Sequence, residues 1–197
     1  MTESICEGCG KALPPFGSVQ LGSMEEGYRH LCLACYNSTI AERCGVNFQH
    51  TEFQPITLTD ADGVAHKFDF TLRLLGDRVA LGAHEIQENL NGGYEFSVIS
   101  FDPEGEPLEL FRELFEKMQR ALEQKHLRQD DHFDVQIAES GIVRGYVTCD
   151  LDSDAGSRLP MLVIDGKSIS WEQLGQMLMS YEGFSFKLEV YDPTEER

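Results

Sequence analysis

Hydrophobic and polar residues alternate along residues 64–74 with the period of a half-buried β-strand. One face of this strand carries Val64, His66, Phe68, Phe70, Leu72 and Leu74. Residues 56–59 precede it across the turn Asp60-Ala61-Asp62-Gly63, and residues 78–83 follow it after a second glycine turn. The pattern therefore predicts three successive antiparallel strands.

Two other segments have the period of an amphipathic helix. Residues 107–128 place apolar residues on one stripe, with acidic residues at the start and basic residues at the end, as the helix dipole favours. Ser170-Trp171-Glu172-Gln173 is typical of a capping box with Ser170 as the N-cap, and Gly183 is expected to end that helix. Both helices are expected to face the core.

The remaining apolar stretches between the two helices predict further strands. Residues 133–138 and 142–148 are expected to pair with each other around the turn Glu139-Ser140-Gly141. Residues 161–164 are expected to form another strand that ends at Asp165-Gly166.

Residues 93–103 and 183–193 share one pattern without a gap: a glycine, two aromatic residues, an apolar residue, a third aromatic residue and Asp-Pro. We expect each segment to be a strand, and the repeat suggests two related halves at 54–104 and 131–194. The alternative is that two unrelated strands use common β residues and a common turn dipeptide. The elements together predict an α+β fold, with a mainly antiparallel sheet domain and two amphipathic helices in residues 51–197.

Composition and charge narrow the class of protein. The chain has 197 residues, 41% of them hydrophobic, and a net charge of −18 from 34 acidic and 16 basic residues. Nucleic acids and anionic membranes bind proteins through clustered Lys and Arg, whereas this chain is strongly acidic. We therefore expect neither as a partner. No apolar run reaches the roughly 18 residues of a membrane span, and the first residues lack the features of an export signal. We therefore expect a soluble, cytoplasmic protein.

Two Cys-x2-Cys pairs, Cys6 with Cys9 and Cys32 with Cys35, carry the strongest chemical pattern of the chain. Each pair places two thiols on one tight turn, and two pairs supply the four corners of a tetrahedral zinc site. Because four thiolates leave no open position for a substrate, the sequence predicts one structural zinc ion. The alternative is dithiol redox chemistry, which ordinarily uses a single such pair at the start of a helix.

The residues around the cysteines predict a small module over residues 1–50. Short apolar stretches between glycines and prolines indicate a β-hairpin, and residues 33–44 indicate a helix that ends at Gly45. With the spacing Cys-x2-Cys-x22-Cys-x2-Cys, this order resembles treble-clef, LIM-type and zinc-ribbon modules. The module precedes an acidic domain with Ile164-Asp165-Gly166-Lys167, the capping-box helix and Gly183-Phe184-Ser185-Phe186, and with these features the chain as a whole resembles bacterial zinc-ribbon-containing proteins. The resemblance implies only the ligand role of the four cysteines, because such modules serve DNA binding, protein binding and stabilisation alike.

Other residues with ligand chemistry give weaker patterns. His30 could replace a cysteine ligand, but we expect it to flank the site, and we expect Cys44 to pack against the end of its helix. His84-Glu85 lacks the spacing of a zinc deaminase. A run of acidic residues resembles the start of a calcium loop without its final glutamate, so we expect a surface loop there. This run consists of Asp150, Asp152 and Asp154.

No local catalytic motif is present in the sequence. We therefore expect a protein-interaction or adaptor protein rather than an enzyme, with the zinc in residues 1–50 and the interaction surface in the acidic domain of residues 51–197. The alternative is an enzyme or small-ligand-binding protein with its site in a cleft of the larger domain. A DNA-binding regulator is a third hypothesis, which would require a basic stripe.

Overall fold

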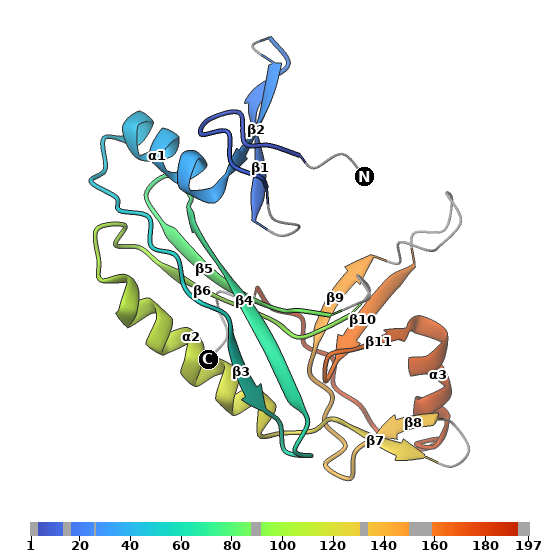
Figure 1. Ribbon diagram of the computed structural model, residues 1–197. Helices are drawn as coiled ribbons and strands as arrows, with labels where there is room; N and C mark the ends of the chain where they lie inside the picture. The colour runs from blue at the N-terminus through green and yellow to red at the C-terminus, as the bar shows by residue number, and fades with distance from the viewer. Residues whose placement is uncertain are drawn as a thin grey trace. The chain divides into compact units, whose positions relative to one another are not determined.

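The computed structural model describes residues 4–13, 17–25, 27–87, 92–130, 134–149 and 159–192. Within these residues the chain forms three helices and eleven strands (Figure 1). The paired strands are mainly antiparallel, so the fold is α+β as the sequence predicts.

The chain divides into two compact units, and each is built from separate stretches of sequence. Unit 1 consists of Met1–Pro55, Asp69–Ala83 and Phe96–Glu116. Unit 2 consists of Ile56–Phe68, His84–Glu95 and Lys117–Arg197.

Unit 1 begins with the predicted hairpin and helix. Strands β1 (Ser18–Ser23) and β2 (Gly27–Cys32) pair antiparallel, and helix α1 (Leu33–Cys44) follows β2 directly. The helix ends at Gly45, whose φ of 67° is the left-handed conformation that glycine adopts most readily. The N–H of Gly45 donates to the carbonyl of Ala41. These elements confirm the local predictions for this region.

A four-stranded sheet has the order β3 (Ile56–Thr59), β4 (Ala65–Leu74), β5 (Val79–Glu85), β6 (Glu95–Ser100). The alternation along β4 is confirmed, because Phe68, Leu72 and Leu74 are buried while Lys67 and Arg73 are exposed. In unit 1, helix α2 (Pro107–Leu122) packs on this sheet through Phe111. The Phe111 ring lies 5.1 Å from that of Phe70 on β4 and 5.0 Å from that of Phe53.

Helix α2 is shorter than the predicted helix of residues 107–128. The carbonyl of Leu122 accepts a hydrogen bond of 2.9 Å from the N–H of Ala61, and Lys125 pairs with Asp60. Residues 127–130 then form strand β7 (Leu127–Asp130) instead of a last helical turn. Contacts from distant residues therefore override a continuous helical pattern.

The C-terminal part of unit 2 contains five strands and helix α3 (Trp171–Met179). Strand β7 pairs with β8 (Asp134–Ile137), and a three-stranded sheet has the order β11 (Lys167–Ser170), β10 (Pro160–Ile164), β9 (Tyr146–Cys149). The predicted pairing of residues 133–138 with 142–148 is therefore wrong, and β11 was not predicted.

Helix α3 starts at the predicted capping box, in which the Ser170 hydroxyl accepts from the N–H of Gln173. The helix packs over the neighbouring strands on one apolar cluster. This cluster consists of Leu127, Val135, Ile137, Ile164, Ile169 and Met177. The helix ends at Met179, and Gly183 lies beyond a further turn.

The two repeat segments differ in structure. Residues 93–103 contain β6, but the described part of residues 183–193 forms no strand. The prediction of a strand is therefore wrong for the second segment, and the duplication stays a hypothesis. No helix among the described residues has both the length and the apolar character to cross a membrane.

Candidate functional site

The two predicted cysteine pairs come together in unit 1 as one group, here called the cysteine cluster: Cys6, Cys9, Cys32 and Cys35. Their sulfur atoms all lie within 4.8 Å of one another, and the sulfurs of Cys9 and Cys32 are 3.8 Å apart. Cys32 is the last residue of β2 and the N-cap of α1, and Cys35 lies in the first turn of α1. These four side chains could hold a metal ion.

The first pair lies on a tight loop that a bridge between Ile5 and Ala12 closes. The N–H of Cys6 donates to the carbonyl of Lys11, and the N–H of Gly10 donates to the carbonyl of Cys6, both at 2.8 Å. The sulfur of Cys6 accepts from the backbone N–H of Cys32 at 3.2 Å. These hydrogen bonds of the backbone shape the loop of Cys6 and Cys9 and hold it next to Cys32.

Gly8 lets the two pairs approach closely. A Cβ atom at this position would lie 2.9 Å from the sulfur of Cys35 and 3.0 Å from its Cβ. Any side chain at residue 8 would therefore displace Cys35.

The pKa values of the cysteines differ strongly within the cluster. Burial alone would raise the pKa of Cys6, but hydrogen bonds from the backbone of Cys32, Cys9 and Gly8 outweigh it and lower the pKa to about 6. Burial, followed by the neighbouring cysteines, raises the pKa of Cys35 to about 12. The cluster therefore resists holding four negative sulfurs by itself, which is the state that a bound cation stabilises.

Other residues considered as ligands lie apart from the cluster. The N–H of His30 donates to the Glu7 carboxylate at 3.0 Å, and its ring contacts the amide of Gln20. Cys44 is exposed rather than packed at the end of α1, and Cys149 is exposed at the end of β9. None of the six cysteines forms a disulfide. The acidic run that begins at Asp150 lies outside the described residues.

Asn37 joins the helix of the cysteine cluster to the sheet within unit 1. Its side chain is fully buried on α1, donates to the carbonyl of Leu72 at 2.8 Å and accepts from the N–H of Leu74 at 2.8 Å. A second contact of its amide nitrogen, at 2.8 Å, is with the ring of His50. The amide thus binds β4 as the backbone of another strand would.

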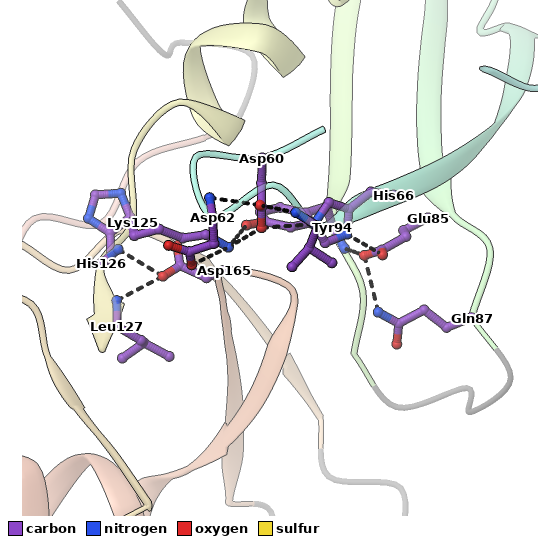
Figure 2. Close-up of polar contacts among 11 residues, drawn as sticks. Asp60, Asp62, His66, Glu85, Gln87, Tyr94, Lys125, His126, Leu127 and Asp165 are labelled. Atoms are coloured by element: carbon purple, nitrogen blue, oxygen red, sulfur yellow. Dashed lines mark hydrogen bonds and ion pairs between the residues drawn. The ribbon is translucent and has the colours of Figure 1, made fainter. Parts of the chain in front are cut away.

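Unit 2 contains a second group of polar side chains, here called the charge cluster: Asp60, His66, Glu85 and Lys125 (Figure 2). Asp60 lies between Lys125 and His66, and its Oδ2 atom is paired with both. The two ring nitrogens of His66 lie 3.0 Å from Asp60 Oδ2 and 2.6 Å from Glu85 Oε1. Each ring nitrogen of His66 therefore faces a carboxylate oxygen at hydrogen-bonding distance.

Burial and ion pairing shift the pKa values of Asp60 and Lys125 in opposite directions. The Asp60 side chain is 1% exposed, and burial alone would raise its pKa, but the hydrogen bonds from Lys125 and His66 lower it below its usual range. Burial alone would lower the pKa of Lys125, but the bond to Asp60 raises it. Both groups are therefore held in their charged forms.

Tyr94 and Asp165 extend the charge cluster toward the turn between β10 and β11. The Glu85 carboxylate accepts from the N–H of Tyr94 at 2.9 Å, and burial raises the pKa of Tyr94 to about 12. Asp165 accepts from the backbone N–H groups of His126 and Leu127, each at 2.8 Å. A Cβ atom at Gly166 would lie 3.0 Å from the Tyr94 ring. These contacts tie several loops of unit 2 together.

The charge cluster has the features of a structural network rather than of a catalytic site. Both nitrogens of His66 already face carboxylates, so the ring offers no free base. Within the described residues, no group of three or more His, Cys, Asp or Glu besides the cysteine cluster is placed to hold a metal ion. This network was not predicted from the sequence. Its one local signal is His66, a histidine on the apolar face of β4, where a ring nitrogen requires a polar partner.

Three family models match successive parts of the chain, and each is described as a domain of unknown function. They are DUF7685 over residues 5–47, DUF7686 over residues 49–123 and DUF7713 over residues 126–195. No curated protein and no solved structure matches the chain. The matches name no activity, and the predicted division into domains at 1–50 and 51–197 stays a prediction.

Proposed function

We propose that the chain is a zinc-binding protein with one structural zinc ion, and that it acts in the cytoplasm as a protein-interaction or adaptor protein. The observation that carries the zinc assignment is the convergence of the four sulfurs of the cysteine cluster within 4.8 Å. Four thiolates at about 2.3 Å from one zinc ion form a closed tetrahedral shell, which leaves no position for a substrate. The zinc would hold the loop of Cys6 and Cys9 against the start of α1.

Metal analysis of the purified chain tests the zinc assignment. We expect one zinc ion per chain, and we expect Cys35→Ser to lose it because three thiolates bind zinc more weakly. Cys44→Ser is the matched control, since Cys44 lies on the same helix but outside the cluster. A reduced chain that is metal-free and retains α1 and the hairpin would overturn the assignment.

The exposed face of α3 supports the protein-interaction role. The exposed fractions of Trp171, Leu178 and Met179 are 52%, 47% and 67%. Trp is enriched at the centres of protein interfaces, and grouped exposed apolar residues are typical of binding surfaces. The formal charge of −18 supports a protein partner over a nucleic acid.

Affinity capture from the native host, compared between two leucine variants, tests this role. Leu178→Lys on α3 should lose a captured protein that the wild type retains. Leu108→Lys is the matched control, because Leu108 is also an exposed leucine near a helix terminus, on α2, with an exposed fraction of 68%. Identical captured proteins for both variants and the wild type would contradict a binding surface on α3.

The charge cluster is the observation that favours the alternative, an enzyme or small-ligand-binding protein. It contains the buried carboxylate of Asp60, from the turn between β3 and β4, beside His66 of β4 and Glu85 of β5. Because its members already satisfy one another, the structural role is the better explanation. Specific binding of a small molecule that shifts the NMR signals of His66 and Tyr94 would support the alternative.

A further inference from the structure

Residues 184–190, here called the C-terminal segment, follow α3 in unit 2 and form neither a helix nor a strand. Apolar and polar residues alternate along this segment. The exposed fractions of its apolar side chains are 75% for Phe184, 88% for Phe186, 74% for Leu188 and 81% for Val190. This alternation is typical of a strand with one buried face, yet the apolar face lies in solvent.

The backbone of the C-terminal segment is also available for pairing. The N–H of Phe184 donates to the carbonyl of Tyr181 at 2.9 Å, which anchors the start of the segment. No backbone hydrogen bond joins residues 185–190 to other parts of the chain that the structure describes. Free backbone groups beside an apolar face form a template for another strand.

The charges of the C-terminal segment indicate which strand it can pair with. Lys187 and Glu189 form an ion pair with each other, and their side chains are 79% and 68% exposed. They make the segment neutral in a chain with a net charge of −18, so two copies can meet here without local repulsion. We propose that the C-terminal segments of two copies of this chain pair with each other as antiparallel strands.

One register of this pairing satisfies both the charges and the apolar face. With Leu188 opposite Leu188 of the second copy, each Lys187 lies opposite a Glu189. Phe186 then lies opposite Val190, and the apolar side chains of both strands share one face. The pairing has two-fold symmetry, so it closes as a dimer.

Neighbouring registers are unfavourable for reasons that the same residues supply. A shift by two residues places Lys187 opposite Lys187 or Glu189 opposite Glu189. A shift by one residue puts polar side chains on the apolar face. A parallel arrangement brings like charges side by side. A two-stranded ribbon alone is marginally stable in water, so the dimer has a Kd on the order of 10 µM.

Charge exchange tests the pairing and its register in the full-length chain. Sedimentation velocity at about 1 to 200 µM should show a monomer that becomes a dimer, in the concentration range of the expected Kd. Lys187→Glu and Glu189→Lys should each weaken the dimer about tenfold, because like charges then face each other twice. An equimolar mixture of the two variants should restore the dimer, since every Glu again faces a Lys. Lys67→Glu on β4 is the matched control, because Lys67 is also exposed.

Cross-linking tests the two-fold axis independently of charge. In a Cys44→Ser, Cys149→Ser background, Leu188→Cys should form a disulfide between two chains under mild oxidation, because residue 188 faces itself. Phe186→Cys should not, because residue 186 faces residue 190 and lies roughly 13 Å from its own copy.

Four results would overturn the proposal. They are a monomer at every concentration, a dimer that Lys187→Glu leaves unchanged, assembly beyond a dimer, and equal cross-linking at positions 186 and 188. Binding of the C-terminal segment to a different protein alone would give the first of these. None of them bears on the zinc ion or on the α3 surface, which have their own tests.

Discussion

The cysteine cluster of unit 1 and the charge cluster of unit 2 differ in where their positive charge comes from. The cysteine cluster gathers four groups that become anions when they ionise. The charge cluster pairs the carboxylates of Asp60 and Glu85 with the cationic Lys125 and with His66. The first would therefore need a cation from solution to balance four ionised sulfurs, whereas the second contains the cation of Lys125.

This difference predicts opposite responses to chemical change. Chelation should act on unit 1 and leave the charge cluster intact, whereas substitution of one buried charge should act on unit 2 and leave the bound metal intact.

Removal of the metal should have the largest effect. Structural zinc sites in small peptides contribute about 10 to 16 kcal/mol, so the hairpin and α1 should lose their structure when a strong chelator is added. Hydrogen exchange followed by mass spectrometry measures this loss, and it should extend to the N–H of Leu74, which donates to Asn37. Equal protection of α1 with and without chelator would contradict the dependence on metal.

Substitution of Asp60 should have the next largest effect. Asp60→Asn removes a buried carboxylate from two ion pairs and leaves Lys125 without its main partner, so the free energy of unfolding should fall by about 3 kcal/mol. Urea unfolding measures this change. Asp62→Asn is the matched control, because that side chain is 68% exposed and 3.7 Å from Lys125, and it should change stability by less than about 0.5 kcal/mol. A similar loss in both variants would show that burial of Asp60 is unimportant.

The effect of Asp60 should depend on pH with a definite sign. Its folded pKa lies below the ordinary value of 3.8, so its contribution to stability is fully present above about pH 3.8 and is lost as the pH falls through the lowered value. The pKa of Lys125 is raised, so its contribution is present below 10.5 and is lost as the pH rises through the raised value. The stability difference between wild type and Asp60→Asn should therefore be constant near neutral pH and shrink in acid. A difference that grows in acid would contradict the pairing.

A side chain at residue 8 should have the smallest of these effects. Gly8→Ala places a Cβ 2.9 Å from the sulfur of Cys35, so that ligand must move and metal affinity should fall about tenfold. Titration with Co²⁺, whose absorption reports tetrahedral thiolate ligation, measures both the affinity and the geometry. An unchanged affinity and spectrum would mean that Cys35 has room to adjust.

The cysteine cluster could be predicted from sequence because its signals are local. Each pair lies within four residues, the helix that carries Cys35 ends at a glycine, and the hairpin between the pairs has its own turn residues. Local rules of spacing and capping are sufficient for such a module.

The charge cluster could not be predicted because its members come from distant parts of the chain. Asp60 lies in a turn, and Lys125 follows a helix with a sequence separation of 65 residues between them. Each residue has an ordinary local role, so only the tertiary structure brings them together. The same cause explains why the predicted end of α2 is wrong: the helical pattern of the sequence continues to residue 128, but α2 ends at Leu122 and strand β7 begins at Leu127.

Asn37 has a consequence for any attempt to isolate the first fifty residues as a portable metal-binding module. Cutting the chain after residue 50 would remove Leu72 and Leu74 and leave the buried amide of Asn37 without the two backbone groups that it binds on β4. The remaining chain would in turn expose the carbonyl of Leu72 and the N–H of Leu74 at the end of β4. Transfer of this module to another protein would therefore have to include the part of β4 that Asn37 binds.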